Sequence, residues 1–340
     1  MRIGILSSGG DCPGINATIR GVGKTALTYY GMDVVGIYDG FQGLLNKEFT
    51  SLDDKSLSGL LSLGGTILGT SREKPFKKVL DGNADTKPQI IIDNYKKLEL
   101  DCLVCIGGNG TQKTAFKISQ LGLNVVGIPK TIDNDIYGTD VTFGFYSAVD
   151  IATEAIDRLH STASSHKRVM VIELMRHKAG WITLYAGMAG GADVILLPEL
   201  GCDIDKVIKA ILARAKKDKP YSIVAVGEGL ELEGGGKGIS PSSRLSKLIE
   251  EGTGLETRET ILGYVQRGGS PSAFDRNLAT RLGGHATELI AKGQFGRMVS
   301  LNDGQITSVP LEKVAGKLKL VTPDDDLIVQ GKRMGISFGV

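Results

Sequence analysis

Short runs rich in β-branched residues alternate with longer helical patterns along the whole sequence. The strand-like runs are Arg2–Ser7, Asp33–Tyr38, Asp101–Ile106, Asn124–Ile128, Arg168–Leu174, Asp193–Leu197, Ser222–Val226 and Thr257–Tyr264. The helical patterns are Asn16–Thr28, Thr111–Gln120, Ser147–Ser165, Trp181–Ala189, Ile204–Lys217 and Ser242–Gly252. Strands joined by helices form parallel sheets that are covered on both faces. The pattern therefore predicts an α/β fold with mainly parallel sheets.

The length and the charge balance narrow the class of protein further. A chain of 340 residues with 41% hydrophobic residues can bury two cores of ordinary size, so we expect two domains. The net charge of +2 is not concentrated in a run or a tail, which argues against nucleic-acid and membrane partners. No apolar run reaches bilayer length, and Met1–Gly10 lacks the pattern of a signal peptide. We expect a cytoplasmic protein.

Four scattered cysteines, Cys12, Cys102, Cys105 and Cys202, fit a reducing compartment better than a disulfide framework. Cys102 and Cys105 form a C-x-x-C pattern, but they lie in a strand-like run. A spacing of three directs side chains to opposite faces of a strand. We therefore expect two small core residues and no redox or metal site.

The 47 glycines gather in short clusters, several of which directly follow a strand-like run. The two clusters that open a helical pattern are Ser8–Asn16 and Gly107–Thr111. Such turns expose backbone N–H groups beside the positive end of a helix, which favours a phosphate. The first cluster and the helical pattern after it form neither a P-loop nor a dinucleotide fingerprint, because the glycine spacing of both motifs is missing there. One such loop alone is as consistent with a structural turn, whereas two in one sheet favour phosphate binding.

A third loop, Pro129–Asp135, follows the run that ends at Ile128. Asp133 and Asp135 lie two residues apart in it. One carboxylate of such a pair can hold Mg²⁺ while the other accepts a proton. A D-N-D triplet alone is typical of a solvated turn. Its position after two glycine loops favours phosphoryl transfer.

These segments, in this order, closely resemble the 6-phosphofructokinases. The matching segments between residues 8 and 276 are SGGDCPGINATIRG, GGTILGTSR, GGNGT, PKTIDND, SSHKR, the region of Glu228 and ETRETILGYVQRGGSPSAFDR. The resemblance implies two Rossmann-like, three-layer α/β domains with the active site in the cleft, in a homodimer or homotetramer. It also implies Mg²⁺-dependent transfer of a phosphoryl group to the 1-hydroxyl of fructose 6-phosphate, a step of glycolysis.

The resemblance also implies the domain boundaries. Residues 1–142 and 265–310 are expected to form a larger donor-binding domain. Residues 143–264 and 311–340 are expected to form a smaller domain that binds the sugar phosphate.

Position by position, the resemblance assigns a role to each site residue. Asp133 is implied to be the base that takes the proton of the sugar hydroxyl, with Thr131 beside it. Asp135 is implied to hold Mg²⁺, and Asn109 takes the place of a second metal-binding aspartate. The positions implied to contact the phosphoryl donor are Gly10, Arg72, Gly107, Gly108, Asn109, Gly110, Thr111 and Lys130. The positions implied to contact the sugar phosphate are Thr131, Asp133, Arg168, Met175, Glu228, Arg258, Tyr264 and Arg267.

Two of the arginines, Arg168 and Arg258, match positions that the family contributes from a neighbouring subunit to grip the 6-phosphate. Guanidinium groups suit this task because their planar fork binds phosphate through two hydrogen bonds. Phosphoryl transfer needs positioning and charge neutralisation more than covalent catalysis, so one base, one metal and several arginines suffice.

Several positions depart from the family pattern and leave alternatives open. Gly110 leaves the room that ATP requires, whereas Lys130 resembles the pyrophosphate-dependent members. We expect ATP, with pyrophosphate as the alternative donor. Tyr264 replaces a histidine and Arg176 replaces a glycine near the sugar, which leaves another ketose phosphate, such as sedoheptulose 7-phosphate, as an alternative acceptor. A non-catalytic sensor of phosphate ligands is disfavoured because Asp133 and Asp135 are both present.

Overall fold

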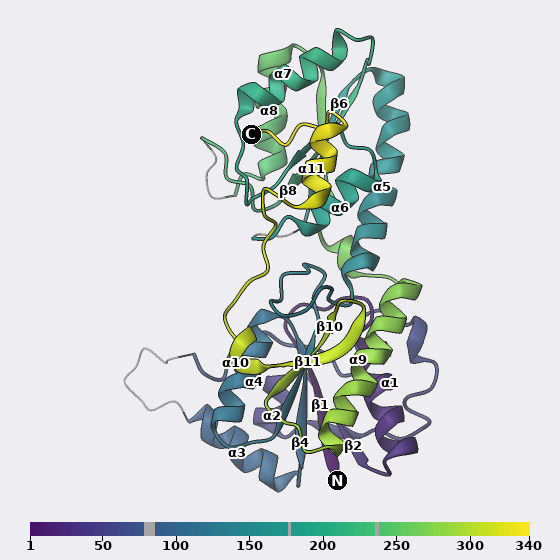
Figure 1. Ribbon diagram of the computed structural model, residues 1–340, viewed down its shortest axis with the longest axis vertical. Helices are drawn as coiled ribbons and strands as arrows, with labels where there is room; N and C mark the ends of the chain where they lie inside the picture. Colours follow the sequence, from purple (N-terminus) through teal and green to yellow (C-terminus); the bar gives the residue numbers. More distant parts are fainter. Residues whose placement is uncertain (78–85, 176–177, 235–237) are drawn as a thin grey trace. The chain divides into compact units, whose positions relative to one another are not determined.

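The computed structural model describes residues 1–77, 86–175, 178–234 and 238–340 (Figure 1). The chain divides into two compact units. Unit 1 comprises Met1–Ser147 and Arg267–Lys319, and unit 2 comprises Ala148–Gln266 and Leu320–Val340. Among the described residues, no helix has the length and apolar character needed to span a lipid bilayer.

Unit 1 is built on a seven-stranded sheet in the order β11-β10-β5-β4-β1-β2-β3. Its strands are β1 (Arg2–Ser8), β2 (Asp33–Ile37), β3 (Phe49–Ser51), β4 (Cys102–Gly107), β5 (Val125–Pro129), β10 (Arg297–Asn302) and β11 (Gln305–Pro310). The five inner strands run parallel, with Ile3 of β1 in register with Val34 of β2 and Cys102 of β4. The two edge strands are antiparallel to their neighbours: β3 pairs with β2, and β11 pairs with β10.

Helices cover both faces of this sheet, with α1 and α9 on one side and α3 and α4 on the other (Figure 1). The helices of unit 1 are α1 (Ile15–Lys24), α2 (Phe41–Asn46), α3 (Lys87–Lys97), α4 (Asn109–Gln120), α9 (Ala273–Ala291) and α10 (Leu311–Val314). A π-helical segment, η1 (Thr25–Tyr29), continues α1, and a 3₁₀ turn, η2 (Leu60–Ser62), follows β3. One core joins Leu6 and Leu103 of the sheet to Tyr95 of α3 and Ile118 of α4.

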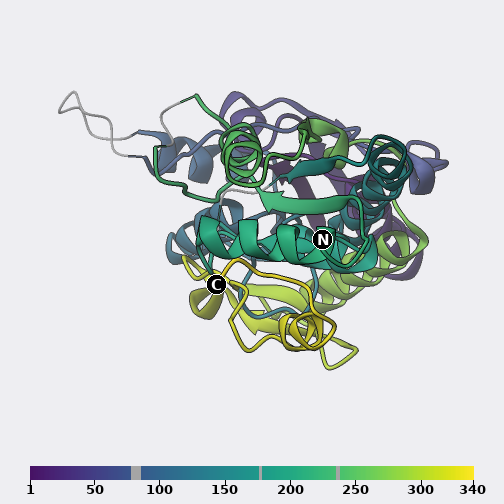
Figure 2. The same ribbon diagram turned by 90° about the horizontal axis from the view of Figure 1, so that it is seen from above.

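Unit 2 has a four-stranded sheet in the order β7-β8-β6-β9, and its paired strands are all parallel. The strands are β6 (Val169–Leu174), β7 (Val194–Leu196), β8 (Ser222–Gly227) and β9 (Thr257–Ile261). The helices are α5 (Phe145–His166), which starts in unit 1, α6 (Trp181–Ala189), α7 (Ile204–Ala215), α8 (Pro241–Thr253) and α11 (Asp326–Arg333). The yellow helix α11 packs on α6 (Figures 1 and 2). Valines of β6 and β8 pack with Ile211 of α7 and Ile249 of α8 in a separate core.

The predicted α/β class with mainly parallel sheets is confirmed, and two expected elements end three or more residues before their predicted ends. The run expected as a strand to Tyr264 stops at Ile261, because Gly263 turns the backbone left-handed (φ +57°) and a 3₁₀ turn, η3 (Gly263–Arg267), follows. The helix expected to reach Thr28 is α-helical only to Lys24 and then widens into η1. Cys102 and Cys105 are free and buried in β4, as the core interpretation predicts.

Helices α1 and α9 approach each other closely through two glycines. A Cβ atom at Gly21 would lie 2.7 Å from the carbonyl oxygen of Thr280, and one at Gly283 would lie 2.7 Å from that of Thr18. Both neighbours are backbone atoms, so the helices would have to separate to admit a side chain. This contact fixes α1, the helix that follows the first glycine loop.

The substitution Gly283→Ala should lower the free energy of unfolding by about 1–3 kcal/mol, because the added methyl group overpacks the contact. Gly284→Ala is the matched control, since its Cβ would meet only the Thr25 hydroxyl at 3.5 Å and alanine favours the helix. Urea denaturation followed by circular dichroism compares the two variants. Equal free energies of unfolding for the two variants would show that the α1–α9 contact can admit a methyl group at Gly283 without loss of stability.

Candidate active site

Three loops gather at one end of the sheet of unit 1. They follow β1, β4 and β5, which are neighbours in the sheet and run parallel, so their carboxyl ends lie side by side. The Thr111 hydroxyl after β4 donates to the carbonyl of Ser8 at 3.3 Å, and the Lys130 amide after β5 donates to that of Gly107 at 3.1 Å. The three segments that sequence analysis singled out therefore form one cluster.

Lys130 ties the third loop to the first. Its side chain is 1% exposed, and its ammonium group donates to the carbonyl oxygens of Ser8, at 3.0 Å, and Gly10. Burial lowers the pKa of Lys130 below its ordinary value, while the surrounding Cys12, Asp11 and Asp133 act in the opposite direction. The resemblance placed Lys130 among donor-binding groups, and in this structure its ammonium group is bonded to the backbone of the first loop.

The first loop is held from two further directions. The Gly9 amide donates to the carbonyl of Ser71 at 2.8 Å, which brings the following, exposed Arg72 to this loop. The Arg267 guanidinium donates to the carbonyl of Asp11 at 3.0 Å, and a Cβ atom at Gly10 would lie 2.8 Å from its Nη1 atom. The resemblance placed Arg267 on the sugar side, and in this structure it lies against the Gly10 loop of unit 1.

The second loop leads into the amino end of α4. Gly108 precedes this helix, no described side chain caps it through a hydrogen bond, and its first turn carries no acidic residue. Its N–H groups and positive dipole end therefore favour an anion. A Cβ atom at Gly110 would meet no described atom within 4 Å. The structure thus has open space at Gly110, the position that the resemblance connects with donor size.

The third loop holds Asp133 in a fixed orientation. Its carboxylate is 3% exposed and accepts a hydrogen bond from the Thr131 hydroxyl at 2.6 Å. The Asp133 amide donates back to the same hydroxyl at 3.1 Å. The Thr131 carbonyl in turn accepts from the Thr142 hydroxyl at 2.7 Å. A carboxylate held this firmly is suited to accept a proton at a defined position.

Asp135 and Asn109 are the candidate protein ligands for a divalent cation. The Asn109 side-chain amide donates to the Asp135 carbonyl at 3.1 Å, so the two residues are adjacent. The other side-chain atom of Asn109, Oδ1, is buried with no hydrogen-bond partner among the described residues. Within the same residues, no group of three or more His, Cys, Asp or Glu side chains could hold a metal ion. Any cation here would complete its shell with water and ligand phosphates, as Mg²⁺ commonly does.

Sequence analysis did not identify Lys319 as part of this cluster. Its ammonium group donates to Asn134 Oδ1 at 3.0 Å, and its backbone amide donates to the Asp135 carbonyl at 2.9 Å. Burial lowers the pKa of Lys319 to about 8, with Asp140 and Asp135 raising it. A lysine 184 positions after Asp135 gives no local signal of such a contact.

In unit 2, three sugar-site candidates lie at the carboxyl end of the sheet. Met175 directly follows β6 and Glu228 directly follows β8, and the Glu228 amide donates to the Leu174 carbonyl at 2.9 Å. Tyr264 lies just beyond β9, within η3, with 75% of its surface exposed. Arg176, the other departure noted near the sugar, lies outside the described residues.

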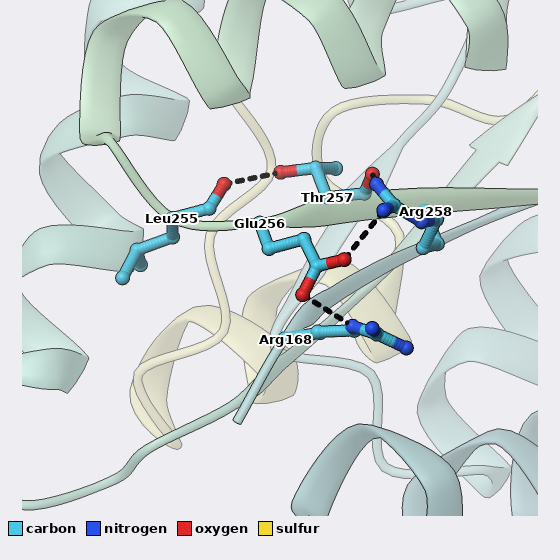
Figure 3. Close-up of polar contacts among 5 residues, drawn as sticks. All are labelled: Arg168, Leu255, Glu256, Thr257 and Arg258. Carbon is cyan, nitrogen blue, oxygen red and sulfur yellow. Dashed lines mark hydrogen bonds and ion pairs between the residues drawn. The ribbon is translucent and has the colours of Figure 1, made fainter. Parts of the chain in front are cut away.

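Arg168 and Arg258 lie at the opposite, amino end of that sheet (Figure 3). Glu256 bridges them: one carboxylate oxygen accepts from Arg168 Nε at 2.6 Å and the other from Arg258 Nη2 at 2.5 Å (Figure 3). These contacts, with the Arg168 hydrogen bond as the largest, lower the pKa of Glu256. The two guanidinium groups thus form one basic patch that a single carboxylate holds together.

The length of β6 separates the two sets of sugar-site candidates. Arg168 precedes this strand and Met175 follows it, and six residues at about 3.3 Å each span roughly 20 Å. A hexose phosphate is much shorter than this distance. The strand therefore places the backbones of Arg168 and Met175 at opposite ends of the unit 2 sheet.

Comparison with known proteins adds a separate line of evidence. The sequence model of the family described as phosphofructokinase matches residues 2–290. The chain is 66% identical over 339 residues to "ATP-dependent 6-phosphofructokinase 3" of Bacteroides thetaiotaomicron, covering 100% of both chains. It is 54% identical over 354 residues to "ATP-dependent 6-phosphofructokinase" of Spirochaeta thermophila, covering 99% of this chain and 97% of the other.

Among solved structures, the chain is similar to phosphofructokinase from Saccharomyces cerevisiae. The TM-score is 0.83 at 31% sequence identity. The match covers 92% of this chain and 45% of the yeast chain.

Proposed function

Because the chain belongs to the phosphofructokinase family, we propose that it transfers a phosphoryl group from ATP to the 1-hydroxyl of fructose 6-phosphate, giving fructose 1,6-bisphosphate. The observation that carries this proposal is the cluster of three loops at the carboxyl ends of β1, β4 and β5. It combines a fixed, buried carboxylate at Asp133 with an uncapped helix terminus at Gly108. We place this reaction of glycolysis in the cytoplasm.

In this proposal Asp133 is the general base. The 1-hydroxyl donates its proton to the Asp133 carboxylate as its oxygen forms a bond to the transferred phosphorus and the bond to the leaving oxygen of ADP breaks. Thr131 keeps one carboxylate oxygen oriented through its 2.6 Å hydrogen bond. Positioning of this kind supplies most of the rate enhancement in phosphoryl transfer, because the loose transition state needs little covalent help.

The donor phosphates are assigned to the first two loops. The backbone at Gly10 and the amino end of α4, from Gly108 to Thr111, present N–H groups to negative charge. Arg72 supplies a cation to the transferred group. We assign Lys130 to hold the first loop in shape, because its ammonium group is bonded to the Ser8 and Gly10 carbonyls.

Mg²⁺ fits the oxygen atoms that the loops provide. Asp135 offers a carboxylate, and the buried Oδ1 atom of Asn109 has no hydrogen-bond partner among the described residues. Bound there, Mg²⁺ would neutralise charge on the donor phosphates. The amide of Asn109 in place of a carboxylate leaves the protein contribution to the cation at one negative charge.

The sugar phosphate is assigned to unit 2 and to a second subunit. Met175, Glu228 and Tyr264 share the carboxyl end of the unit 2 sheet, and we assign them to the sugar. The basic patch of Arg168 and Arg258 lies at the other end of β6, roughly 20 Å away. We therefore propose that this patch binds the 6-phosphate of a sugar held by a neighbouring copy of the chain in a homodimer or homotetramer.

ATP is favoured over pyrophosphate as the donor. Both full-length relatives described above carry "ATP-dependent" in their names. The open space at Gly110 agrees with a donor larger than pyrophosphate. The contacts of Lys130 within the protein also remove the reason for assigning it to pyrophosphate.

Asp133→Ser should lower kcat by about 10²–10⁴-fold, because the proton acceptor is lost. KM for fructose 6-phosphate should change little, since binding does not require the base. Steady-state assays of fructose 1,6-bisphosphate formation test this. Asp93→Ser, on the exposed face of α3, is the control and should match the wild type. Retention of wild-type kcat by Asp133→Ser would remove Asp133 as the base.

Gly110→Asp should reduce kcat/KM for ATP by at least about 100-fold, because the new carboxylate fills the open space and repels the donor phosphates. Gly110→Ala, which adds only a methyl group in that space, should stay close to wild type. Assays with ATP and pyrophosphate in parallel measure both donors. Turnover of the wild type with pyrophosphate alone would overturn the donor assignment and leave the assignment of Asp133 intact.

Two impaired variants should complement each other when the concentration of fructose 6-phosphate is well below the KM of the wild type. Arg258→Ala should raise KM for fructose 6-phosphate at least about tenfold, because a charge-assisted contact to phosphate is lost. Co-expression of Asp133→Ser with Arg258→Ala should restore about one quarter of wild-type activity, since mixed oligomers then contain some sites with both residues. If mixed oligomers form and activity does not recover, Arg258 contributes to the active site of its own chain and not to that of a neighbouring copy.

A further inference from the structure

Lys319, the last residue of unit 1, makes four hydrogen bonds to the loop that carries Asp133 and Asp135. Its ammonium group donates to Asn134 Oδ1 at 3.0 Å, to the Thr139 carbonyl at 3.0 Å and to the Asp140 carbonyl at 2.6 Å. Its backbone amide donates to the Asp135 carbonyl at 2.9 Å. An ammonium group has three protons, so all three have acceptors in one loop.

The residue between the two aspartates requires such support. Asn134 has φ +51°, in the left-handed region that few non-glycine residues occupy. Its Oδ1 atom accepts hydrogen bonds from the Thr142 amide, at 3.1 Å, and from Lys319. Thr142 also bonds the Thr131 carbonyl. The side chain of Asn134 and the hydroxyl of Thr142 therefore link the two ends of this loop. Lys319, which lies outside the loop, holds the Asn134 side chain in place through a further hydrogen bond.

We propose that Lys319 is a positioning residue for phosphoryl transfer, which holds Asn134 and thereby sets the placement of the Asp133 and Asp135 carboxylates. This inference rests on the proposed function, because it assigns these carboxylates to the reaction. Lys319 has no contact role with either substrate in this proposal. Its effect passes through the backbone of residues 133–135.

The chemistry makes small displacements of this loop costly. A general base must lie within hydrogen-bond reach of the proton that it accepts. Misplacement of a reacting group by 1 Å can lower the rate by about 100-fold. Three hydrogen bonds from one cation fix the loop at three points between residues 134 and 140, which limits such displacement.

A purely structural role makes a different prediction. Leu318 forms an isolated antiparallel bridge with Ile136, so the segment is also anchored without the Lys319 side chain. If the side chain served only as an anchor, its loss would lower stability and leave the kinetic constants of the folded enzyme unchanged. The two roles therefore predict different values of kcat for a folded variant that lacks the Lys319 ammonium group.

The test compares Lys319→Met, which keeps the length of the side chain without its charge, with Lys319→Arg, which restores a cation. Lys313→Met, on the exposed surface of α10, is the matched control. We expect Lys319→Met to lower kcat by about 10–100-fold while KM for ATP and for fructose 6-phosphate changes less than about threefold. Lys319→Arg should recover much of this loss, and Lys313→Met should match the wild type. Wild-type kcat in folded Lys319→Met would overturn the proposal.

Asn134→Gly provides a second variant in case Lys319→Met does not fold. Glycine accepts the left-handed conformation but removes the acceptor, so kcat should again fall with KM nearly unchanged. In the Asn134→Gly background, Lys319→Met should have a smaller effect on kcat than in the wild type. If the effects of the two substitutions on kcat were fully additive, or if Asn134→Gly kept the wild-type kcat, Lys319 would not act on the carboxylates through Asn134.

The same assays separate this inference from the proposed function. A wild-type enzyme that forms no fructose 1,6-bisphosphate from ATP would defeat the proposed function. An active wild type with a fully active, folded Lys319→Met variant would defeat only the role of Lys319. Hydrogen exchange at the Thr142 amide adds a readout that does not depend on activity, and it should be faster in Lys319→Met than in Lys313→Met.

Discussion

Parallel pairing of β5, β4 and β1 is the constraint on which the candidate site depends. Because the three strands run in one direction and lie side by side, the loops that follow them meet at one edge of the sheet. Short hydrogen-bonded links then join these loops: Thr111 to Ser8, and Lys130 to Ser8 and Gly10. The glycines at these turns let the backbone itself face a ligand. The clustering of these loops thus follows from strand order and from a few polar contacts.

Strand direction has a different consequence in unit 2. There the parallel sheet separates the residues that we assign to the sugar phosphate, with Met175 and Glu228 at the carboxyl end and Arg168 and Arg258 at the amino end. In the proposed function, one small substrate takes these two sets from two copies of the chain. In this proposal oligomerisation is therefore part of building the site.

The sequence predicts much of the fold and the three loops that meet in the candidate site, since the period of apolar residues and the glycine loops are local signals. The strands β1, β4, β5, β6 and β8 lie where the pattern predicted them. Other features depend on contacts between distant segments. Lys319 meets Asn134 across 185 positions, and Arg267 meets Asp11 across 256. No local pattern marks either contact, and the end of β9 depended on the left-handed backbone at Gly263.

The carboxylate of Glu256 reduces the net positive charge that the basic patch presents to an anion. Each guanidinium group gives one N–H bond to this carboxylate, so an incoming anion meets two cations whose charge is partly neutralised. A phosphate ester offers about two charges and several acceptor oxygens, whereas chloride offers a single charge. In the proposed function, this partial neutralisation would leave the basic patch selective for a sugar phosphate over small singly charged anions.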